Sequence, residues 1–411
     1  MPGVIRRIFY GWWMVAGCLV IAVVAWSCAL YGPSVYLYSI SQTRGWSIGL
    51  ISSALTCAFI VNGFALGVVG SLIGRIGPRP VMTVGAALLA IALAGIGQVN
   101  QVWQVYVAFA CMGLGWSCLS TTAISSALAP WFDRHQGRAV STALLGASLG
   151  GVVGVPTLLF LIGKLGFGTA MSLVSLLVLA LVLPISLFIM RRHPHDLGLT
   201  ADGIAASGRS GVATSRAWTR AQALQTLALR TVTIAFGLAL LVQIGFLTHQ
   251  VTLLRLHLGE SATALTVSCA AALAFAGRLL LARFSDRVDV RITAALVLIV
   301  AGIGLAVVCL AQTSWQIVAG VLIYGFMAGN ITTQSPLIVR REFGAASFGA
   351  IFGMTAMLIQ LVSAMGPAFF GTLHDLTGGY TMPVGIAALM NFIAAVCVIA
   401  GRRSAAAIAQ A

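Results

Sequence analysis

A single arginine, Arg278, lies inside an otherwise apolar stretch of this chain. The stretch 271–291 begins within an apolar run and ends in a charged cluster that includes Asp286 and Arg287. In a membrane helix, Arg278 would lie two turns, about 12 Å, inside the boundary that Asp286 marks, because each residue rises about 1.5 Å. Holding a guanidinium at that depth costs roughly 2.5–3.5 kcal/mol on insertion scales, and a charge kept at such a cost usually has a function.

The chemistry open to Arg278 depends on its counter-charge. No acidic residue occurs within any apolar run of the sequence, so the simplest partner is a bound anion. A guanidinium stays protonated and offers a planar fork that matches a carboxylate. One fixed positive charge balances one negative charge, which favours a monocarboxylate over a dicarboxylate. The alternative is structural: an arginine near a helix end whose stem lets the charge reach water.

The composition indicates a membrane protein that crosses the bilayer many times. Of its 411 residues, 60% are hydrophobic and only 8% are charged. We predict an all-α membrane protein of twelve transmembrane helices, the first of which is too long for a cleavable signal peptide. The apolar stretches of spanning length are 12–38, 47–73, 81–98, 103–129, 138–162, 168–190, 231–255, 262–284, 293–311, 316–339, 347–373 and 382–400.

The basic residues are distributed unevenly between the two sides of these spans. If the N-terminus is inside, 19 of the 23 lysines and arginines fall on that side, and only Arg44, Lys164 and Arg255 fall on the other. This bias follows the positive-inside rule, so we predict a plasma (inner) membrane protein with both termini in the cytoplasm. The net charge of +15 then faces anionic lipids, and no nucleic acid partner is needed.

The eight cysteines all lie within apolar spans and lack the spacing of metal ligands. We therefore predict no cofactor and no metal site. No nucleophile, base or pair of carboxylates occurs at a common depth either, so we do not expect an enzyme.

The two halves of the chain repeat one arrangement. Arginines recur at matching positions after the second span of each half, Arg75 with Arg287 and Arg79 with Arg291. A repeat at half the chain length is typical of transporters, whose sites lie near the midplane between the halves. We predict two pseudo-symmetric six-helix bundles and a cytoplasmic linker, with boundaries at 1–192, 193–226 and 227–411.

The turn GSLIGRIGPRPV, residues 70–81, resembles the cytoplasmic signature G-x-L-x-D-R-x-G-R-K of the major facilitator superfamily. Five positions match, although Gly74 replaces the aspartate; the matching residues are Gly70, Leu72, Arg75, Gly77 and Arg79. The resemblance implies a twelve-helix fold that works by alternating access. It also implies a cytoplasmic gate, to which we assign Arg75, Arg79, Asp286 and Arg287.

Further landmarks resemble one branch of that superfamily, the monocarboxylate transporters and the oxalate/formate antiporters. They are FYGWWMV near the start, PWFDRHQGRA, HPHDLGLTADG, the pair Gly277-Arg278, and GPAFFGTLHDLTGGY at 366–380. In that branch an arginine of the eighth span binds the substrate carboxylate, and Arg278 is the matching position. The chain departs at Ala274, where animal members have an aspartate, and in span eleven, whose central polar group is Gln360 rather than a cation.

The resemblance also implies that spans one, four, seven and ten line the cavity. Tyr31, beside the Gly32-Pro33 break, offers a phenol that can donate to an anion. His249 is the only histidine well inside a span and could carry a coupling proton. For each polar candidate the plainer alternative is an interhelical hydrogen bond. With Arg278, we predict as substrate-binding residues Tyr31, His249, Trp116, Asn330, Gln334 and Gln360.

The sequence thus predicts a secondary active transporter of a small organic anion, most simply a monocarboxylate. Its expected partners are the carboxylate, protons as a second candidate, and membrane lipids, and we expect it to act as a monomer. Three alternatives stay open: an exporter of a drug-like or sugar substrate in which Arg278 is structural, a carrier of an inorganic anion, and a membrane sensor that transports nothing. The direction of transport and the choice between exchange and proton symport also stay open.

Overall fold

The computed structural model describes residues 9–133, 135–201, 218–284 and 289–402, which form helices and turns without a strand. Within them, eleven helical segments are long and apolar enough to cross a membrane. One of these, Leu227–Leu281, has 55 residues. At 1.5 Å per residue it would extend about 80 Å, far more than the ~30 Å of a hydrocarbon core. It is two spans joined at Gly259, so the eleven segments make the twelve crossings that the sequence predicts.

The first six spans and the segments that follow them have these bounds. They are α1 (Tyr10–Trp26), the π-helical η1 (Ser27–Tyr31) and α2 (Gly32–Arg44); α3 (Ile48–Ile76); α4 (Pro78–Gly97); α5 (Val102–Ser117) and α6 (Thr121–Leu128); α7 (Gln136–Leu165); α8 (Phe167–Pro184) with the π-helical η2 (Ile185–Ile189); the short 3-10 helix η3 (Pro194–Leu197); and α9 (Arg220–Gln225).

The last six spans are formed by fewer, longer helices, because two of these continue through a turn. They are α10 (Leu227–Phe284), α11 (Val290–Cys309), α12 (Ser314–Ala364), α13 (Gly366–Thr377) and α14 (Thr381–Ala400). The turns are at Gly259 (φ 72°) in α10 and at Gly344 (φ 75°) in α12, a backbone region that residues with a side chain rarely adopt. α10 therefore supplies two spans, and α12 supplies one span and the first part of the next, Ile351–Thr377, which α13 completes.

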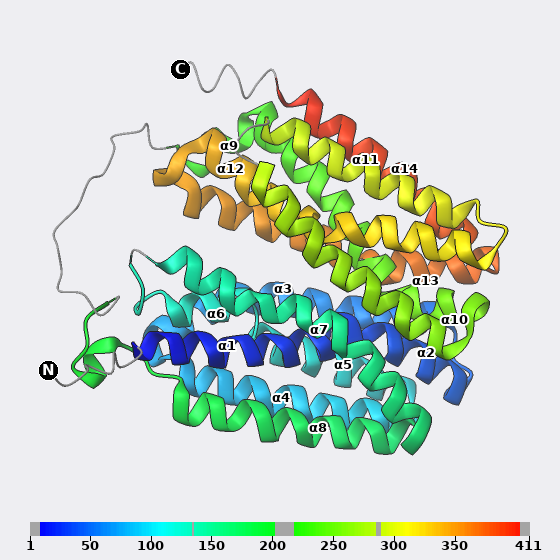
Figure 1. Ribbon diagram of the computed structural model, residues 1–411, viewed down its shortest axis with the longest axis horizontal. Coiled ribbons are helices and arrows are strands. Elements are labelled where there is room, and N and C mark those ends of the chain that lie inside the picture. The colour runs from blue at the N-terminus through cyan, green and yellow to red at the C-terminus, as the bar shows by residue number, and fades with distance from the viewer. Residues whose placement is uncertain (1–8, 134, 202–217, 285–288, 403–411) are drawn as a thin grey trace, which may run out of the picture.

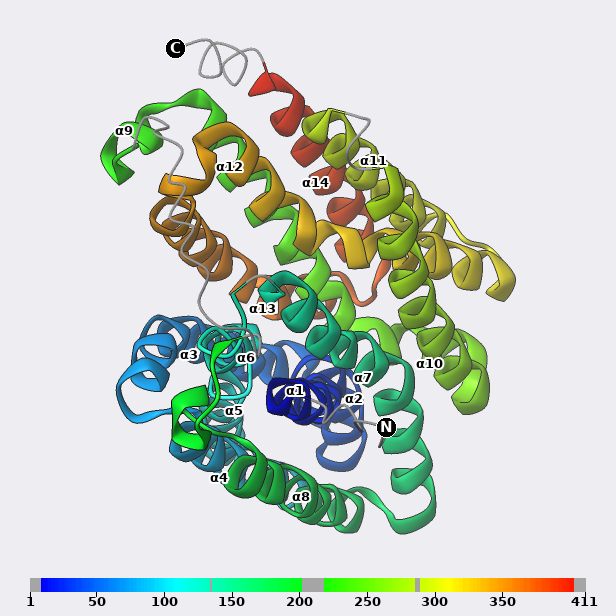
Figure 2. The ribbon, with the colours of Figure 1, turned by 60° about the vertical axis from the view of Figure 1, so that its left-hand side comes forward.

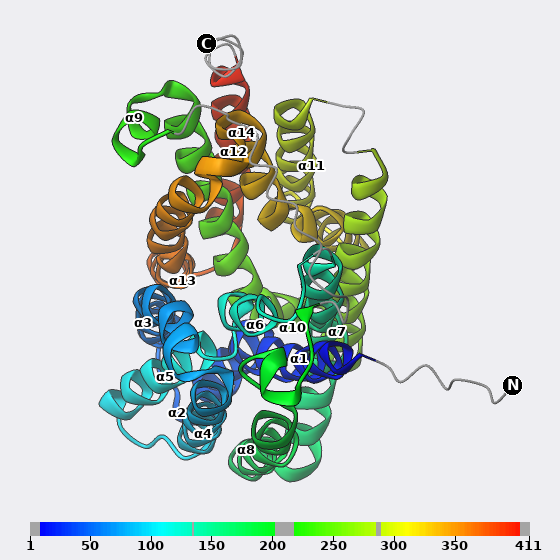
Figure 3. The same ribbon diagram turned by 90° about the vertical axis from the view of Figure 1, so that its left-hand side faces the viewer.

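The helices gather into two groups. α1 to α8 lie in one group and α10 to α14 in the other, and the start of α1 and the end of α14 lie at the same end of the molecule (Figure 1). We call this the terminal end and the opposite one the outer end. Near the outer end, α3 lies beside α13 and α7 lies beside α10 (Figure 2 and Figure 3). The bundle borders at residues 192 and 227 remain a prediction, and they fall close to the end of η2 and the start of α10.

The break that the sequence shows at Tyr31 does not end the first span. The helix widens instead into the π-helical segment η1. Pro33 has no N–H to donate to the preceding turn, and the hydroxyl of Tyr36 donates to the carbonyl of Cys28 at 3.0 Å. Single π-turns of this kind are frequent at functional sites. This one ends at Tyr31, a residue of the cavity wall described below.

Glycines let α7 approach α1 closely. A Cβ added at Gly150 would lie 2.6 Å from the carbonyl oxygen of Val23, and one added at Gly154 would lie 2.7 Å from Cβ of Ser27. The hydroxyl of Ser27 donates to the carbonyl of Gly150 at 3.0 Å. This contact fixes α7 against the helix that leads to Tyr31, and α7 carries Ser148 to the same cavity.

We expect Gly150→Ala to destabilise the protein, because the added methyl group would press on the backbone of α1. Overpacking of this kind costs about 1–3 kcal/mol. The matched control is Gly67→Ala, since no heavy atom lies within 4 Å of a Cβ at Gly67. Thermal unfolding in detergent should show a lower midpoint for the first variant only. Equal midpoints for the two variants would contradict the close approach of the helices.

Candidate functional site

The guanidinium of Arg278 lies between the two groups of helices. Its Nε donates to the carbonyl of Gly329 in α12 at 3.1 Å, and its Nη1 lies 3.4 Å from the hydroxyl oxygen of Ser148 in α7. Both acceptors are neutral. In the described part of the chain, no carboxylate lies within ion-pair distance of Arg278. The guanidinium is therefore oriented by the protein without being neutralised by it.

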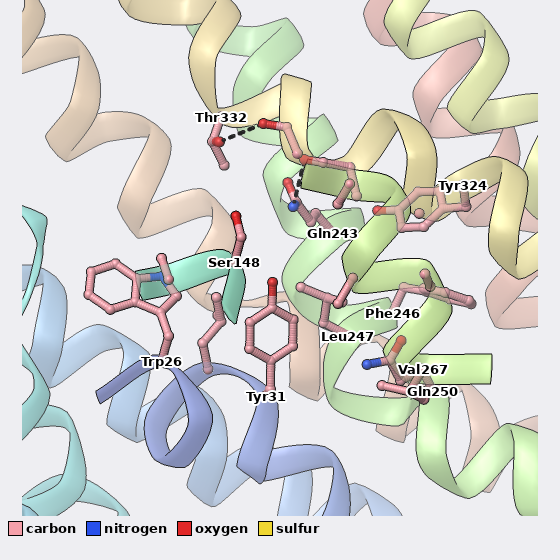
Figure 4. Close-up of a pocket in the computed structure, with 18 of the residues that line it drawn as sticks. Trp26, Tyr31, Ser148, Gln243, Phe246, Leu247, Gln250, Val267, Tyr324 and Thr332 are labelled. Carbon is pink, nitrogen blue, oxygen red and sulfur yellow. Dashed lines mark hydrogen bonds between the residues drawn. The ribbon is translucent and has the colours of Figure 1, made fainter. Parts of the chain in front are cut away.

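Arg278 lines two adjoining cavities. The smaller, of about 110 Å³, extends toward the outer end, and Figure 4 shows Tyr31 and Ser148 on one side of it and Gln243 and Tyr324 on the other. The larger, of about 400 Å³, extends toward the terminal end. Arg278 thus stands where the two spaces meet.

Three other predicted residues lie on the walls of these cavities. Tyr31 lines the smaller cavity, where Gly151 makes room for its ring: a Cβ at Gly151 would lie 2.7 Å from Cζ of Tyr31. Trp116 and Gln360 line the larger cavity. The structure therefore brings these side chains around the two spaces that share Arg278.

Asn330 and Gln334 are placed differently. Both are buried, but neither is among the residues that line the two cavities, where α12 presents Gly329 and Thr332 instead. The side chains of Asn330 and Gln334 face other parts of the packed bundle. Their assignment as substrate-binding residues stays a prediction, and their position does not support it.

His249 also lies outside the lining of both cavities. It is buried where the halves meet at the outer end. Its Nε2 lies 3.2 Å from the hydroxyl of Ser52 in α3 and 3.1 Å from the carbonyl of Pro367, and its Nδ1 lies 3.0 Å from the hydroxyl of Tyr380. This is the geometry of a residue that links the two halves, and it does not support direct contact with a substrate.

Further contacts close the outer end. The N–H of Gly49, in the first turn of α3, donates to Oδ2 of Asp375 at 2.8 Å. The N–H of Ala368 donates to the hydroxyl of Thr56 at 3.0 Å. The guanidinium of Arg255 lies 4.6 Å from the ring centroid of Tyr38. Together with His249 these contacts hold the halves together at the end away from the termini.

The predicted gate residues at the terminal end are only partly described. Arg75 is exposed and Arg79 is half-buried. Asp286 and Arg287 lie outside the described residues. The role of these residues as a gate therefore stays a prediction.

The structure shows a buried ion pair nearby that the sequence reading missed. Arg291 binds Glu342 through two bonds, Nε to Oε1 at 2.6 Å and Nη2 to Oε2 at 2.9 Å. Arg291 also donates to the carbonyls of Ala228 and Val398, each at 2.8 Å. The pair therefore joins α10, α11, α12 and α14. The repeat that relates Arg291 to Arg79 marks this arginine in the sequence, but it does not point to its partner Glu342.

Asp289 forms hydrogen bonds beside Arg291, at the same end of the second half. Its Oδ1 accepts from the N–H groups of Arg291 and Ile292 at the start of α11, and its Oδ2 accepts from Nε of Arg402 at 3.0 Å. Partial burial raises the pKa of the Asp289 carboxyl, but the hydrogen bonds from Arg402 and the backbone lower it further, so its pKa lies below the ordinary value. Asp289 stays charged near neutral pH and ties the end of α14 to α11.

Several cavity residues were not among the predicted site. Ser148, Gln250 and Tyr324 line the smaller cavity, and Gln243 lines both. Gln243 and Gln250 are seven residues apart and so lie on one face of α10. Two glutamines with this spacing in an apolar span indicate which face of the helix is turned to a polar cavity, so this face could have been predicted from the sequence.

We expect Asp375→Ala to weaken the closure of the outer end. The N–H of Gly49 would lose a charged acceptor, a loss worth about 1.5–3 kcal/mol. Spin labels at the exposed positions Thr43 and Ser261, in a background without native cysteines, should show a larger share of long distances. Asp196→Ala is the control, because Asp196 accepts from the N–H of His193 away from this interface. Identical distance distributions before and after the Asp375 change would contradict its role.

Comparison with known families agrees with this architecture. The family model described as Major Facilitator Superfamily matches residues 17–367 and 251–408. The chain belongs to the Major Facilitator Superfamily. It is therefore a membrane transporter by family and not an enzyme, as the sequence predicts.

The most similar curated relatives include monocarboxylate transporters. Monocarboxylate transporter 13 of Rattus norvegicus is 26% identical over 333 residues, which cover 78% of this chain and 73% of the relative. Monocarboxylate transporter 11 of Homo sapiens is 27% identical over 343 residues, which cover 79% and 69%. The resemblance to monocarboxylate transporters is thus confirmed, at low identity and over most of the chain.

Solved structures of other superfamily members share the fold. A bacterial homologue of the human lysosomal transporter Spinster, in an inward-facing and unoccupied conformation, has a TM-score of 0.73 at 13% identity over 99% of both chains. The nucleoside transporter NupG has a TM-score of 0.72 at 13% identity, over 94% of this chain and 99% of its own. At this identity the likeness establishes the fold alone.

Proposed function

We propose that this transporter carries a monocarboxylate by alternating access, with Arg278 as the anchor for the carboxylate. The observation that supports this most is a guanidinium at the junction of two cavities, held by the neutral acceptors Gly329 and Ser148. The similarity to monocarboxylate transporters 13 and 11 supports the same substrate class.

The geometry of Arg278 leaves room for a carboxylate. The bond from Nε to Gly329 fixes the plane of the guanidinium. The contact of Nη1 with Ser148, at 3.4 Å, is longer than the 2.7–3.2 Å of a good hydrogen bond. No described residue accepts a hydrogen bond from Nη2. A carboxylate can therefore take Nη1 and Nη2 together as a bidentate pair, with the phenol of Tyr31 on the wall of the same cavity.

The same charge couples loading to closure. In the empty carrier, closing the halves around Arg278 would remove water from an unpaired cation, which costs several kcal/mol. A bound carboxylate offsets that cost, so the loaded carrier closes more readily than the empty one. Because Arg278 is on α10 and Ser148 on α7, the anion would bind where the two halves approach each other. Such coupling is compatible with exchange of one anion for another and with symport of the anion and a proton.

The number of positive charges favours a single negative charge on the substrate. Among the described residues that line the two cavities, Arg278 is the one cation. A dicarboxylate, or an inorganic anion that needs several cations, would keep uncompensated charge in a space of low dielectric. A monocarboxylate would not.

We further propose the setting in which this cycle runs. The excess of lysine and arginine on one side favours a plasma (inner) membrane with the termini in the cytoplasm. In that orientation the larger cavity faces the cytoplasm and the closed outer end faces the outside. The protein is proposed to act as a monomer among membrane lipids, since each half supplies one wall of a single site.

We expect Arg278→Gln to reduce uptake of a labelled monocarboxylate into liposomes at least 30-fold. Losing one partner of a buried charge pair costs about 2–5 kcal/mol. Arg230→Gln, an exposed change on the same helix, is the control and should transport normally. A thermal unfolding midpoint for each variant shows that it folds. If Arg278→Gln transports as well as the control, Arg278 does not anchor the carboxylate. A neutral drug-like or sugar substrate is then the better hypothesis.

We propose His249 as the residue that would carry a coupling proton. Its three partners, Ser52, Pro367 and Tyr380, each offer an oxygen that can accept from a protonated ring. His374, which pairs with Asp375 at 3.1 Å, lies with its ring 4.5 Å from that of Tyr380. Protonation of His249 would therefore act on the contacts that close the outer end.

If His249 carries the coupling proton, His249→Gln should remove most of the pH dependence of uptake between pH 5.5 and 7.5. The wild type should transport faster as the outside becomes more acidic, because the proton would enter with the substrate. His257→Gln is the control, since His257 is exposed near the same end. A wild type whose uptake does not change with pH, or a variant with the wild-type profile, would favour exchange without protons.

A further inference from the structure

We propose that the substrate is an elongated monocarboxylate that carries a second hydrogen-bonding group about 10 Å from its carboxylate, a spacing of two helical turns. Gln250 and Tyr324 would bind that distal group in the smaller cavity. The inference rests on the proposed function, since it takes Arg278 as the site of the carboxylate.

The smaller cavity is a slot that runs along three helical segments. The residues that line it recur three, four or seven positions apart within each segment, so they lie on one face of that helix. The lining runs over 243–250 and 267–278 in α10 and over 321–332 in α12. Seven to eleven residues of helix rise about 10–16 Å, so the cavity is much longer than one carboxylate.

Two hydrogen bonds to neighbouring carbonyls fix the depth of the residues in this slot. Arg278 donates to Gly329 at 3.1 Å, and the side-chain amide of Gln243 donates to Ala328 at 3.0 Å. Arg278 and Gln243 therefore lie at one level of α12. Gln250 follows Gln243 by seven residues toward the outer end, which places it about 10 Å beyond the guanidinium.

Tyr324 lies on the same side of this level. It precedes Gly329 by five residues in α12, which corresponds to about 7.5 Å along the helix toward the outer end. Its ring packs against that of Phe246, with centroids 4.9 Å apart. Tyr324 and Gln250 both line the slot, and both lie beyond Arg278.

The polar atoms of the slot are buried and unpartnered. Oε1 of Gln243, Nε2 of Gln250 and the hydroxyl of Tyr324 make no hydrogen bond within the described structure. Gln250 and Tyr324 are 3% and 1% exposed. A buried polar group left unpaired is unfavourable, so a ligand that bonds these groups gains affinity. Since Nε2 of Gln250 can only donate, the distal group must be an acceptor, such as a hydroxyl, keto or amide oxygen.

The walls between the two polar ends are apolar. Figure 4 shows Leu247 and Phe246 between Gln243 and Gln250. Ala271 and Ala274, in the second span of α10, line the slot with small side chains that leave it open. Such walls suit a hydrocarbon chain. At carbon–carbon bond lengths near 1.5 Å, about 10 Å corresponds to roughly eight bonds in an extended chain. A short acid would reach Arg278 but not Gln250.

The test compares 8-hydroxyoctanoate with octanoate, which differ only in the distal hydroxyl. Binding is measured to purified wild-type protein by calorimetry and by competition for uptake. We expect the wild type to bind the hydroxy acid about tenfold more tightly, the effect of one hydrogen bond that satisfies a buried partner. In Gln250→Met and in Tyr324→Phe, which removes a single oxygen, the ratio of the two affinities should fall toward one. Gln98→Met, an exposed change, should keep it.

Each result decides between the two proposals. Equal affinity of the wild type for the two acids, or a preference that survives in both cavity variants, would overturn the distal subsite. If Arg278→Gln lost both acids in that case, the anchor would stand and only the elongated substrate would be wrong. If Arg278→Gln bound both acids as the wild type does, the proposed function itself would fail.

Discussion

The uncompensated charge of Arg278 is the constraint around which the structure can be understood. A guanidinium lies where two cavities meet between the halves of a membrane protein, and the described residues offer it only neutral oxygens. Such a charge is stable only with water or with an anion. In the proposed cycle, water would reach it when the halves are apart, and an anion would be needed when they close. The proposed alternating-access cycle and the proposed substrate class both rest on this single requirement.

The chain contains a useful contrast to Arg278. Arg291 is buried whereas Arg278 is half-buried, and Arg291 has a bidentate partner in Glu342 and donates to carbonyls of neighbouring helices. Every N–H of its guanidinium donates to an acceptor in the protein, as expected of a residue that stabilises helix packing. Arg278 has one good bond, one long contact and one open side. The same residue type thus holds helices together at one position and keeps an unpaired side at the other, where we propose that the carboxylate binds.

Much of the fold could be predicted because apolar length is a strong signal in membranes. The apolar runs gave the spans, and the turns at Gly259 and Gly344 divide the long helices as those runs require. The arginine of the candidate site could be predicted for a related reason, since a charge inside such a run stands out.

The faces of the other helices could not be predicted in the same way. A membrane helix is apolar on most sides, so its sequence shows which side faces the cavity only where spaced polar residues mark that side, as Gln243 and Gln250 do in α10. The prediction therefore included Asn330 and Gln334 but omitted Thr332, which lies on the cavity side of the same helix. It also placed His249 in the cavity, whereas packing against Ser52 and Tyr380 turns it to the contact between the halves.

The most direct test of the central claim changes the ligand and leaves the protein intact. A carboxylic acid that stabilises the wild-type protein is compared with its own primary amide, which has nearly the same shape but no charge, in a binding titration near neutral pH. If the positive charge of Arg278 binds the carboxylate, the acid should bind at least 30-fold more tightly than the amide, because a desolvated charge pair is worth about 2–5 kcal/mol. Equal affinities would contradict the account.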